Sequence, residues 1–418
     1  MKKLFESEFS KNLLTMITGT ALAQLIPLIF IPVLARIYPV HEHGTFTLYF
    51  TILTTLSVLA TLRYELAIVL PYDDREAKKI FRLSLVISLG ISVFSLLVIF
   101  FFNKIILTYL NKENDIKFWI YFIPLSLFLN GLIQSQNYWL NREKKYFELT
   151  KSKIILSSVA VFIPLILSFF VKYSGILIIS YIASQVLCLL YVYFIDKSLF
   201  ELKEVFDFKE LKQIASKYKK FPLLNTPSTV VDQIASVIPL FFINKYFGLT
   251  MAAYYGMALK VVSVPSSFLS YSISQTLFKE IVNKRNNNES FFYLMKKAFV
   301  NLALLGLIPT LIFLFFGEFL FTTVLGSTWK VAGDMVTIIC ISAYVKFIIS
   351  PLSITLVASN KLHLIAIWQI IYLVANFLII FLVNYQEDVF KYLFFLMVCD
   401  VFVYIIYAYI ILKASKKN

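Results

Sequence analysis

The sequence has few of the residues from which metal, redox and nucleotide sites are built. Only three cysteines occur, Cys188, Cys340 and Cys399, and each lies inside an apolar run. Their spacing matches no metal site, so we interpret them as small buried hydrophobes and expect neither disulfides nor zinc. No Gly-x-x-x-x-Gly-Lys-Ser/Thr loop is present to hold nucleotide phosphates, and ATP hydrolysis is therefore not expected.

Histidine is equally scarce, with His41, His43 and His363 as its three occurrences. The first two stand in a short polar segment between apolar runs, where we expect an exposed turn rather than a metal site. Asp73 and Asp74 pose a similar choice, because paired aspartates bind magnesium in membrane enzymes that transfer sugar phosphates. Here the pair stands in a Lys-rich loop, and we expect it to be solvated. We predict no cofactor, no resident metal and no catalytic residue.

Charged residues are also few, at 15% of the 418 residues, whereas 59% are hydrophobic and 17% aromatic. This balance lies far from that of a soluble globular protein. The apolar residues gather in runs such as Leu13–Ala35, Gly44–Leu62 and Phe81–Phe102. A helix needs roughly 20 such residues to cross the hydrocarbon of a membrane. Because the first run is too long for the apolar part of a signal peptide, we expect it to be retained as a span.

The pattern of apolar runs predicts an all-α polytopic membrane protein with about 12 transmembrane helices. The longest loop lies near the middle of the chain and is predicted to form a cytoplasmic linker with an amphipathic helix on the membrane surface. Six spans precede this linker and six follow, so the two lobes share one orientation and any symmetry axis lies along the membrane normal. The predicted lobes are 1–195 and 222–418, and the linker is 196–221. The predicted spans are 13–35, 44–62, 81–102, 118–139, 153–171, 174–195, 222–244, 250–278, 297–316, 333–357, 363–383 and 390–412.

The 39 Lys and Arg residues are divided unevenly between the two sides of these spans. The N-terminal segment, the C-terminal tail and every second loop together hold 29 of them, and the opposite side holds 8. By the positive-inside rule, the richer side is cytoplasmic and includes both termini. The asymmetry accounts for the net charge of +15 without a nucleic-acid partner.

Four ionisable residues fall well inside the predicted spans, namely Asp232, Lys260, Lys346 and Asp400. A charge at the bilayer centre costs at least ~2.5–3.5 kcal/mol on insertion scales, so each should face a bundle interior or a watery cavity. Two interpretations stay open. In one, the lysines attract an anionic head group and an aspartate carries a coupling ion. In the other, the four residues form structural salt bridges, for instance between Asp232 and Lys260.

Uncharged polar residues inside the spans leave a similar choice between cavity lining and hydrogen bonding from helix to helix. They cluster in the span at 118–139 and occur singly elsewhere. These residues are Gln24, Asn130, Gln134, Gln136, Asn137, Asn225 and Gln275. Prolines at positions 27, 32, 239 and 265 indicate kinked or broken helices, which suit a protein that must bend.

Several segments of the chain resemble a known family. Leu34–Tyr38 followed by Gly44, and then Leu62–Pro71, are similar to the N-terminal signature of Wzx-type O-antigen and capsule flippases. These belong to the multidrug/oligosaccharidyl-lipid/polysaccharide (MOP) exporter superfamily. Asn137–Tyr146 and the stretch from Phe221 to Pro265 are similarly typical of it, and the resemblance covers the whole chain in length and span count.

This resemblance implies a MATE-like fold of two six-helix lobes around a central cavity that opens alternately to each side. The implied cargo is an undecaprenyl-diphosphate-linked oligosaccharide repeat unit, moved across the bacterial inner membrane. Membrane lipids and the polysaccharide polymerase with its chain-length machinery are further implied partners. Related flippases carry cationic residues in the cavity, and by placement these would be Lys260, Lys346, Arg36 and Arg63. For Arg63 an anchoring pair with Glu65 is an equal alternative, and no cation is expected near the middle of a span in the first lobe.

Two other functions stay open. A membrane polymerase or ligase acting on lipid-linked glycans would have a similar number of spans, but such enzymes generally carry a large external loop. The longest outer segments here, 103–117 and 317–332, are short. The second alternative is a drug or small-ion exporter of the same superfamily, and the motifs at Arg63–Pro71 and Asn137–Tyr146 favour the glycan branch over it.

Overall fold

The computed structural model describes residues 8–110, 114–170, 173–200, 208–287, 289–359, 361–382 and 388–416. Throughout these ranges the regular structure is helical and no strand occurs, which confirms the all-α prediction. The chain forms two compact units, Met1–Gln233 and Ile234–Asn418.

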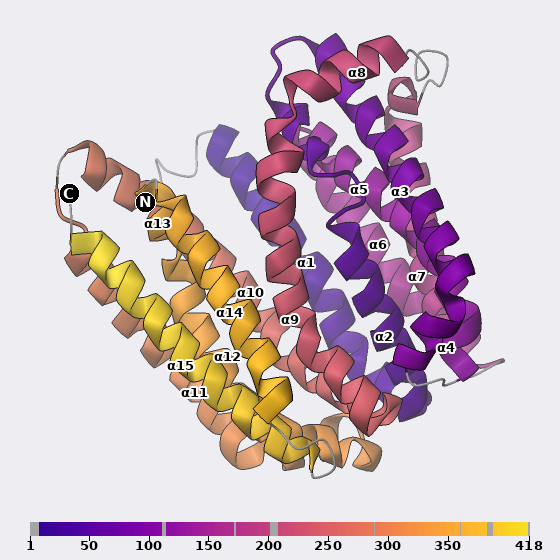
Figure 1. Cartoon of the computed structure of the whole chain (residues 1–418), viewed down its shortest axis with the longest axis vertical. Coiled ribbons are helices and arrows are strands. Elements are labelled where there is room, and N and C mark those ends of the chain that lie inside the picture. The colour runs from indigo at the N-terminus through magenta and orange to yellow at the C-terminus, as the bar shows by residue number, and fades with distance from the viewer. Residues whose placement is uncertain are drawn as a thin grey trace. The chain divides into compact units, whose positions relative to one another are not determined.

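The first unit is a bundle in which α1 packs against α6, α6 against α7, and α3 against α5. Figure 1 shows its α-helices, and short 3-10 helices and the π-helix η6 complete its connections. The elements are α1 (Glu8–Ile37), α2 (Val40–Ser57), η2 (Tyr64–Val69), α3 (Asp74–Tyr109), α4 (Asn114–Trp119), η3 (Ile120–Phe122), α5 (Ile123–Arg142), α6 (Tyr146–Leu167), α7 (Ser174–Ile195), η4 (Lys197–Phe200), α8 (Phe208–Lys217) and η6 (Phe221–Asn225).

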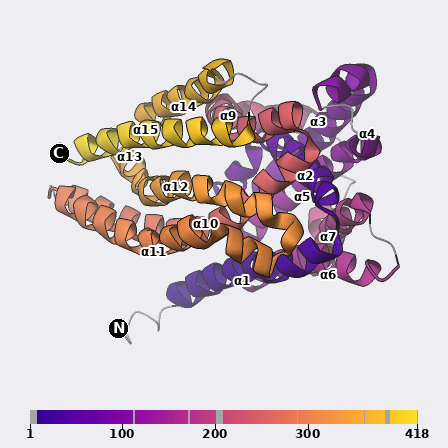
Figure 2. The same cartoon turned by 90° about the horizontal axis from the view of Figure 1, so that it is seen from below.

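The second unit is built around α12, which packs against α10, α11 and α15. The long helices of this unit run roughly alongside one another (Figure 2). The chain enters the unit within α9 (Thr226–Phe247) and continues through α10 (Leu249–Asn286), α11 (Phe292–Val324), η7 (Ser327–Trp329), α12 (Lys330–Leu352), α13 (Ile354–Ala358), α14 (Leu362–Leu382) and α15 (Val389–Lys416).

Ten segments of the described residues are helices long and apolar enough to cross a membrane, and they coincide with ten of the predicted spans. The two remaining predicted spans, 44–62 and 250–278, are also largely helical and correspond to α2 and α10. The hydropathy of α2 is lowered by His41, Glu42 and His43 in its first turn and by its threonines, and that of α10 is lowered by its serines. The polar character of α10 has a structural reason, since this helix lines a cavity.

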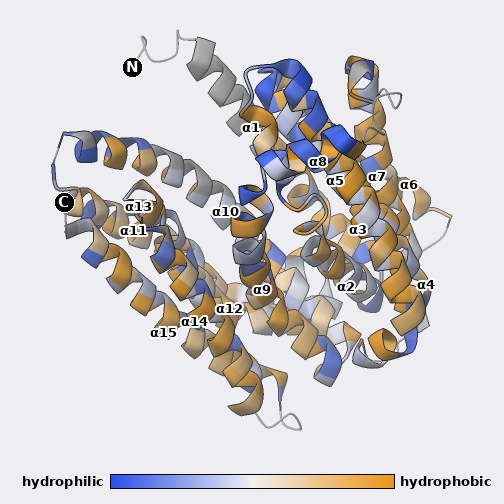
Figure 3. Ribbon diagram, turned by 45° about the horizontal axis from the view of Figure 1, so that its top comes forward, coloured by the Kyte–Doolittle hydropathy of each residue, from blue (hydrophilic) through white to orange (hydrophobic). Residues whose placement is uncertain are grey.

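The helix surfaces carry many large apolar side chains that are exposed in the described part of the chain. Phe101, Phe315 and Phe381 have exposed fractions of 73%, 72% and 75%. Figure 3 shows that hydrophobic residues dominate most of the long helices. Apolar surface of this extent is not stable in water, and in a chain with ten membrane-length helices it faces lipid. The protein is therefore a multi-pass membrane protein.

The Asp73-Asp74 pair has a structural role at the start of α3. Asp73 caps the helix, because its Oδ1 accepts a hydrogen bond of 3.0 Å from the backbone N–H of Arg75. Asp74 pairs with Arg142, whose Nη2 lies 2.8 Å from Asp74 Oδ1. Among the described residues, neither aspartate belongs to a group of three or more side chains able to hold a metal ion. Helix capping and this ion pair account for both carboxylates.

Arg142, the last residue of α5, joins α5 to the connection between η2 and α3. Its guanidinium donates hydrogen bonds to the carbonyl oxygens of Ile68 at 3.4 Å, Tyr72 at 3.2 Å and Pro71. We expect Arg142→Lys to lower the free energy of unfolding by about 2 kcal/mol, because an ammonium group lacks the planar fork that reaches several acceptors. Arg75→Lys, at an exposed site near the same connection, is the control. Equal thermal unfolding temperatures of the two variants in detergent would contradict this role.

The helix predicted in the central linker is α8, although the expected start at Phe206 lies outside the described residues. The first unit covers part of its apolar face, whereas Phe208 is 71% exposed. Leu211 and Ile214 are buried in a hydrophobic cluster with residues of η2 and α3. Lys217 donates a hydrogen bond to Glu76 of α3, and this bond raises the pKa of the lysine above its ordinary value. The helix is therefore held by the first unit itself.

Candidate functional site

The second unit contains a cavity of about 490 Å³, a volume typical of ligand pockets. Residues of α9, α10, α12, α14 and α15 line it. The lining combines aliphatic side chains with serine and tyrosine hydroxyl groups, one lysine and one aspartate. The serines are Ser236 of α9, Ser263, Ser266, Ser267 and Ser270 of α10, and Ser342 and Ser350 of α12.

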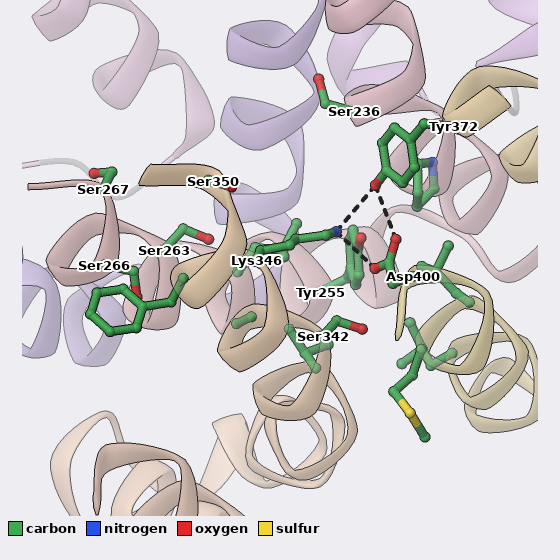
Figure 4. Close-up of a pocket in the computed structure, with 18 of the residues that line it drawn as sticks. Ser236, Tyr255, Ser263, Ser266, Ser267, Ser342, Lys346, Ser350, Tyr372 and Asp400 are labelled. Carbon is green, nitrogen blue, oxygen red and sulfur yellow. Dashed lines mark hydrogen bonds and ion pairs between the residues drawn. The ribbon is translucent and has the colours of Figure 1, made fainter. Parts of the chain in front are cut away.

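Lys346, Tyr372 and Asp400 form a hydrogen-bonded triad in the wall of this cavity (Figure 4). Lys346 Nζ donates to Asp400 Oδ2 at 2.7 Å and to Tyr372 Oη at 3.1 Å. The Tyr372 hydroxyl in turn donates to Asp400 Oδ1 at 3.0 Å. Asp400 is 3% exposed, whereas the Lys346 side chain is 35% exposed. The carboxylate is thus buried in the wall, and the ammonium group has access to the cavity.

Aromatic rings hold the triad in place. Trp368 stacks on Tyr372 with ring centroids 5.4 Å apart, and on Tyr407 with centroids 4.1 Å apart. The Lys346 ammonium lies 5.6 Å from the centroid of the Tyr372 ring and 5.8 Å from that of Tyr404. Such cation–π contacts favour the charged lysine. The rings fix α14 against α15 and so determine where the Tyr372 hydroxyl lies.

The sequence left cavity lining and salt-bridge formation open for the intramembrane charges, and for Lys346 both descriptions apply. Lys346 lines the cavity, and it also pairs with Asp400. The two charges cancel while the pair is intact, so the cavity of the second unit is not strongly cationic in this state.

Lys260 lies on α10 at the edge of the face that lines the cavity. It precedes Ser263 by one turn and Ser267 by two turns, so the three side chains share one side of the helix. Lys260 is exposed and lies roughly 17 Å along the helix from its first residue, at 1.5 Å per residue. Within the described part of the second unit it makes no ion pair.

The other charged residues predicted for the site lie in the first unit. Arg36 is exposed in the last turn of α1, and Asp232 is exposed on α9. Arg63 has a left-handed backbone with φ of 63°, and its Nη1 lies 3.4 Å from Glu65 Oε1. Glu65 is 1% exposed and also accepts a hydrogen bond from Thr61. This contact is the anchoring pair that the sequence suggested as the alternative for Arg63.

Two of the predicted polar residues of α5 hydrogen-bond to α2. Asn130 Nδ2 donates to Ser57 Oγ at 3.1 Å, and Gln134 Nε2 donates to the Ser57 carbonyl oxygen at 3.3 Å. These side chains therefore join two helices of the first unit. Of the remaining candidates, Gln24 and Asn225 are exposed and Asn137 is half-buried, while the side chain of Gln275 lies outside the described residues.

The start of α6 differs from the prediction, and a lysine is affected. The span was expected to begin at Lys153, but α6 begins at Tyr146. Lys153 consequently lies about 10 Å inside the helix rather than in the preceding loop. Its Nζ donates to Thr20 Oγ1 of α1 at 3.0 Å. Among the described residues of the first unit, Lys153 is thus a cation within a helix rather than in a loop, about a third of the way along α6.

Sequence reasoning missed Tyr255, Tyr372 and the serines of α10 as lining residues. Tyrosine gives little signal here, because 25 tyrosines are distributed among the apolar runs. The serines did carry a signal. Positions 263, 266, 267 and 270 follow the i, i+3, i+4, i+7 spacing that places residues on one face of a helix.

Several solved structures are similar to this chain in fold. A multidrug resistance MATE family transporter of the MOP superfamily matches with a TM-score of 0.71 and 14% sequence identity over 96% of each chain. The lipid II flippase MurJ matches with a TM-score of 0.66 and 14% identity over 94% of this chain and 98% of that one. The Vibrio cholerae MATE transporter VcmN matches with a TM-score of 0.63 and 13% sequence identity, over 99% of this chain and 96% of that one. At these identities the likeness establishes the fold, and the predicted MATE-like membrane fold is confirmed.

A model of the polysaccharide biosynthesis protein family matches residues 33–334. The chain therefore belongs to the polysaccharide biosynthesis protein family and has the fold of the MOP superfamily. A comparison with curated protein sequences gives no match.

Proposed function

We propose that this protein is a flippase of the Wzx type. It moves an undecaprenyl-diphosphate-linked oligosaccharide repeat unit, destined for O-antigen or capsule, across the bacterial inner membrane by alternating access. The observation that carries the proposal is a lysine-bearing, hydroxyl-lined cavity among membrane-length helices in a member of the polysaccharide biosynthesis protein family.

The chemistry of the cargo matches that cavity. A diphosphate and its sugars cannot enter hydrocarbon without losing their hydration, whereas the polyprenyl tail is soluble there. Lys346 and Lys260 supply ammonium groups for the diphosphate, and the serines of α10 supply hydrogen bonds for sugar hydroxyls. The tail remains in the lipid throughout. The MurJ structure, described as that of a lipid II flippase, offers a precedent for this fold with a lipid-linked substrate.

The remaining parts of the proposal follow the sequence. The lobes 1–195 and 222–418 move relative to each other, and both termini face the cytoplasm. Arg63, on the cytoplasmic side, contributes to the first contact with the diphosphate, and Arg36, at the opposite end of α1, contributes on the side of release. A polymerase and its chain-length machinery then consume the translocated repeat unit, which makes the movement favourable.

Export of drugs or small ions is the second candidate, since structures of this fold include a multidrug resistance transporter. It fits the cavity less well. A cationic substrate needs an uncompensated carboxylate, but Asp400 is already neutralised by Lys346.

The proposal is tested by deleting the gene from its host. We expect surface polysaccharide to disappear and the lipid-linked repeat unit to accumulate on the cytoplasmic side, because the polymerase no longer receives it. Both are measured by gel analysis of surface glycan and by mass spectrometry of extracted lipids, with the wild-type gene on a plasmid as control. Intact surface glycan together with increased drug sensitivity would favour the exporter instead.

A further inference from the structure

Asp400 already makes with Lys346 the kind of contact that a bound phosphate would make, and it cancels the charge of the ammonium. Its Oδ2 accepts from the ammonium at 2.7 Å, a distance that a phosphate oxygen would also adopt. The Asp400 carboxylate is 3% exposed, so bulk water cannot supply its hydrogen bonds and it depends on groups of the protein. A phosphate in the cavity must therefore compete for the charge of this ammonium with a carboxylate that belongs to the protein.

Lys346 and Asp400 are the charged residues among those that line the cavity. Lys346 approaches Asp400 from α12, Tyr372 from α14 and Tyr255 from α10. The nearby titratable groups of α15 itself are Tyr392, Cys399 and Tyr404. Phenols and thiols of this kind are ordinarily neutral near pH 7. Removing the negative charge of Asp400 would therefore leave the Lys346 ammonium without a counter-ion.

We propose that Asp400 is an internal placeholder for the substrate phosphate, and that a proton on Asp400 releases Lys346 to bind the phosphate. This inference rests on the proposed function. One proton bonds to a carboxylate oxygen of Asp400 and ends its attraction for the ammonium. Lys346 keeps its own proton and turns to the phosphate, so that Asp400 takes up one proton for each substrate molecule bound.

Tyr372 allows the buried carboxyl group to remain hydrogen-bonded in both states. With Asp400 ionised, the Tyr372 hydroxyl donates to Oδ1 and accepts from Lys346. A protonated carboxyl group has an O–H donor of its own, which can donate to the same hydroxyl oxygen after Lys346 has left. Neither state leaves the acid without a hydrogen-bond partner, which would be expensive in a buried site.

A proton suits this site better than a sodium ion. Sodium is a hard cation that needs several oxygen ligands, and one oxygen of Asp400 is already held by an ammonium at 2.7 Å. A second cation beside that ammonium would be repelled by its like charge. A proton removes the charge of the acid without adding a cation next to Lys346.

Because proton binding to Asp400 and diphosphate binding to Lys346 are coupled, the affinity for a diphosphate should depend on pH. The full-length wild-type protein in detergent should bind farnesyl diphosphate more tightly as the pH falls from 8 to 6, by up to roughly tenfold per pH unit. Isothermal titration calorimetry in two buffers with different ionisation heats measures the protons taken up. Because the probe itself titrates, the comparison is with Asp400→Asn, which should bind more tightly and take up about one proton fewer. Replacing sodium by choline at constant ionic strength should change nothing.

Two further variants keep the test decisive if Asp400→Asn fails to fold. Tyr372→Phe removes a donor to the carboxylate and should shift tight binding to higher pH, whereas Lys346→Ala should abolish binding. Equal proton uptake by wild type and Asp400→Asn, or sodium-dependent binding, would overturn the placeholder and leave the flippase proposal intact. Absence of farnesyl diphosphate binding at every pH, in wild type as in the variants, would overturn both.

Discussion

Replacing Lys346 with methionine is expected to abolish transport and to destabilise the second unit at the same time. Asp400 would remain in the wall of the cavity, 3% exposed, without its counter-ion. Breaking one side of a buried ion pair costs about 3–5 kcal/mol, and access of the cavity to water places this case near the lower value. Transport fails for a separate reason, because the diphosphate loses its ammonium ligand.

A double variant separates these two effects. With Lys346→Met and Asp400→Leu together, no uncompensated charge remains, and apolar replacement of a buried pair is often neutral or stabilising. We therefore expect the free energy of unfolding in detergent to return to within about 1 kcal/mol of the wild type, while flipping of lipid-linked repeat units in vesicles stays absent. Transport by the double variant would show that Lys346 does not hold the substrate. A single variant as stable as the wild type would show that the pair does not stabilise the fold.

The fold was predictable because lipid leaves the backbone few choices. Every peptide group in hydrocarbon must be hydrogen-bonded within its own segment, so an apolar run of sufficient length becomes a helix. Ten predicted spans met that rule on length and apolarity. α2 and α10 are helices with many hydroxyl groups, and hydropathy alone understates them because those groups bond to protein or line the cavity. The helix start at Tyr146 was missed for the opposite reason, since polar residues of the first turns carry no membrane signal.

Individual charges of the site were also predictable, but their partners were not. Lys346 and Asp400 were identifiable because an ionisable residue inside an apolar run has a high free-energy cost in the membrane and is therefore rare without a structural or functional role. The pairing depends on how α12 and α15 are rotated about their own axes, which packing decides and sequence spacing does not. The pair suggested as an example, Asp232 with Lys260, lay on adjacent spans. The observed pair joins residues 54 positions apart.

The close contact between α11 and α12 predicts a large loss of stability when a side chain is added to Gly333. At Gly333 of α12, an added Cβ would lie 2.7 Å from the Cα atom of Glu318 and 3.0 Å from the carbonyl oxygen of Gly317. Both are backbone atoms of α11, so they cannot move aside as a flexible side chain can. Small residues permit this close approach of two helices, which is a common way of packing them in membranes.

Gly333→Ala should therefore destabilise the protein, whereas Gly90→Ala should stabilise it or leave it unchanged. Gly90 is in the interior of α3 and Gly333 in the first turn of α12, and within helices alanine is normally favoured over glycine by about 0.5–1 kcal/mol. A Cβ at Gly90 meets nothing within 4 Å, so that preference applies there. At Gly333 the clash costs about 1–3 kcal/mol and exceeds the preference. Thermal unfolding of the two variants in detergent measures the difference, and changes of the same sign would refute the contact. Because α12 also carries Lys346, its displacement from α11 should weaken farnesyl diphosphate binding in Gly333→Ala and leave it unchanged in Gly90→Ala.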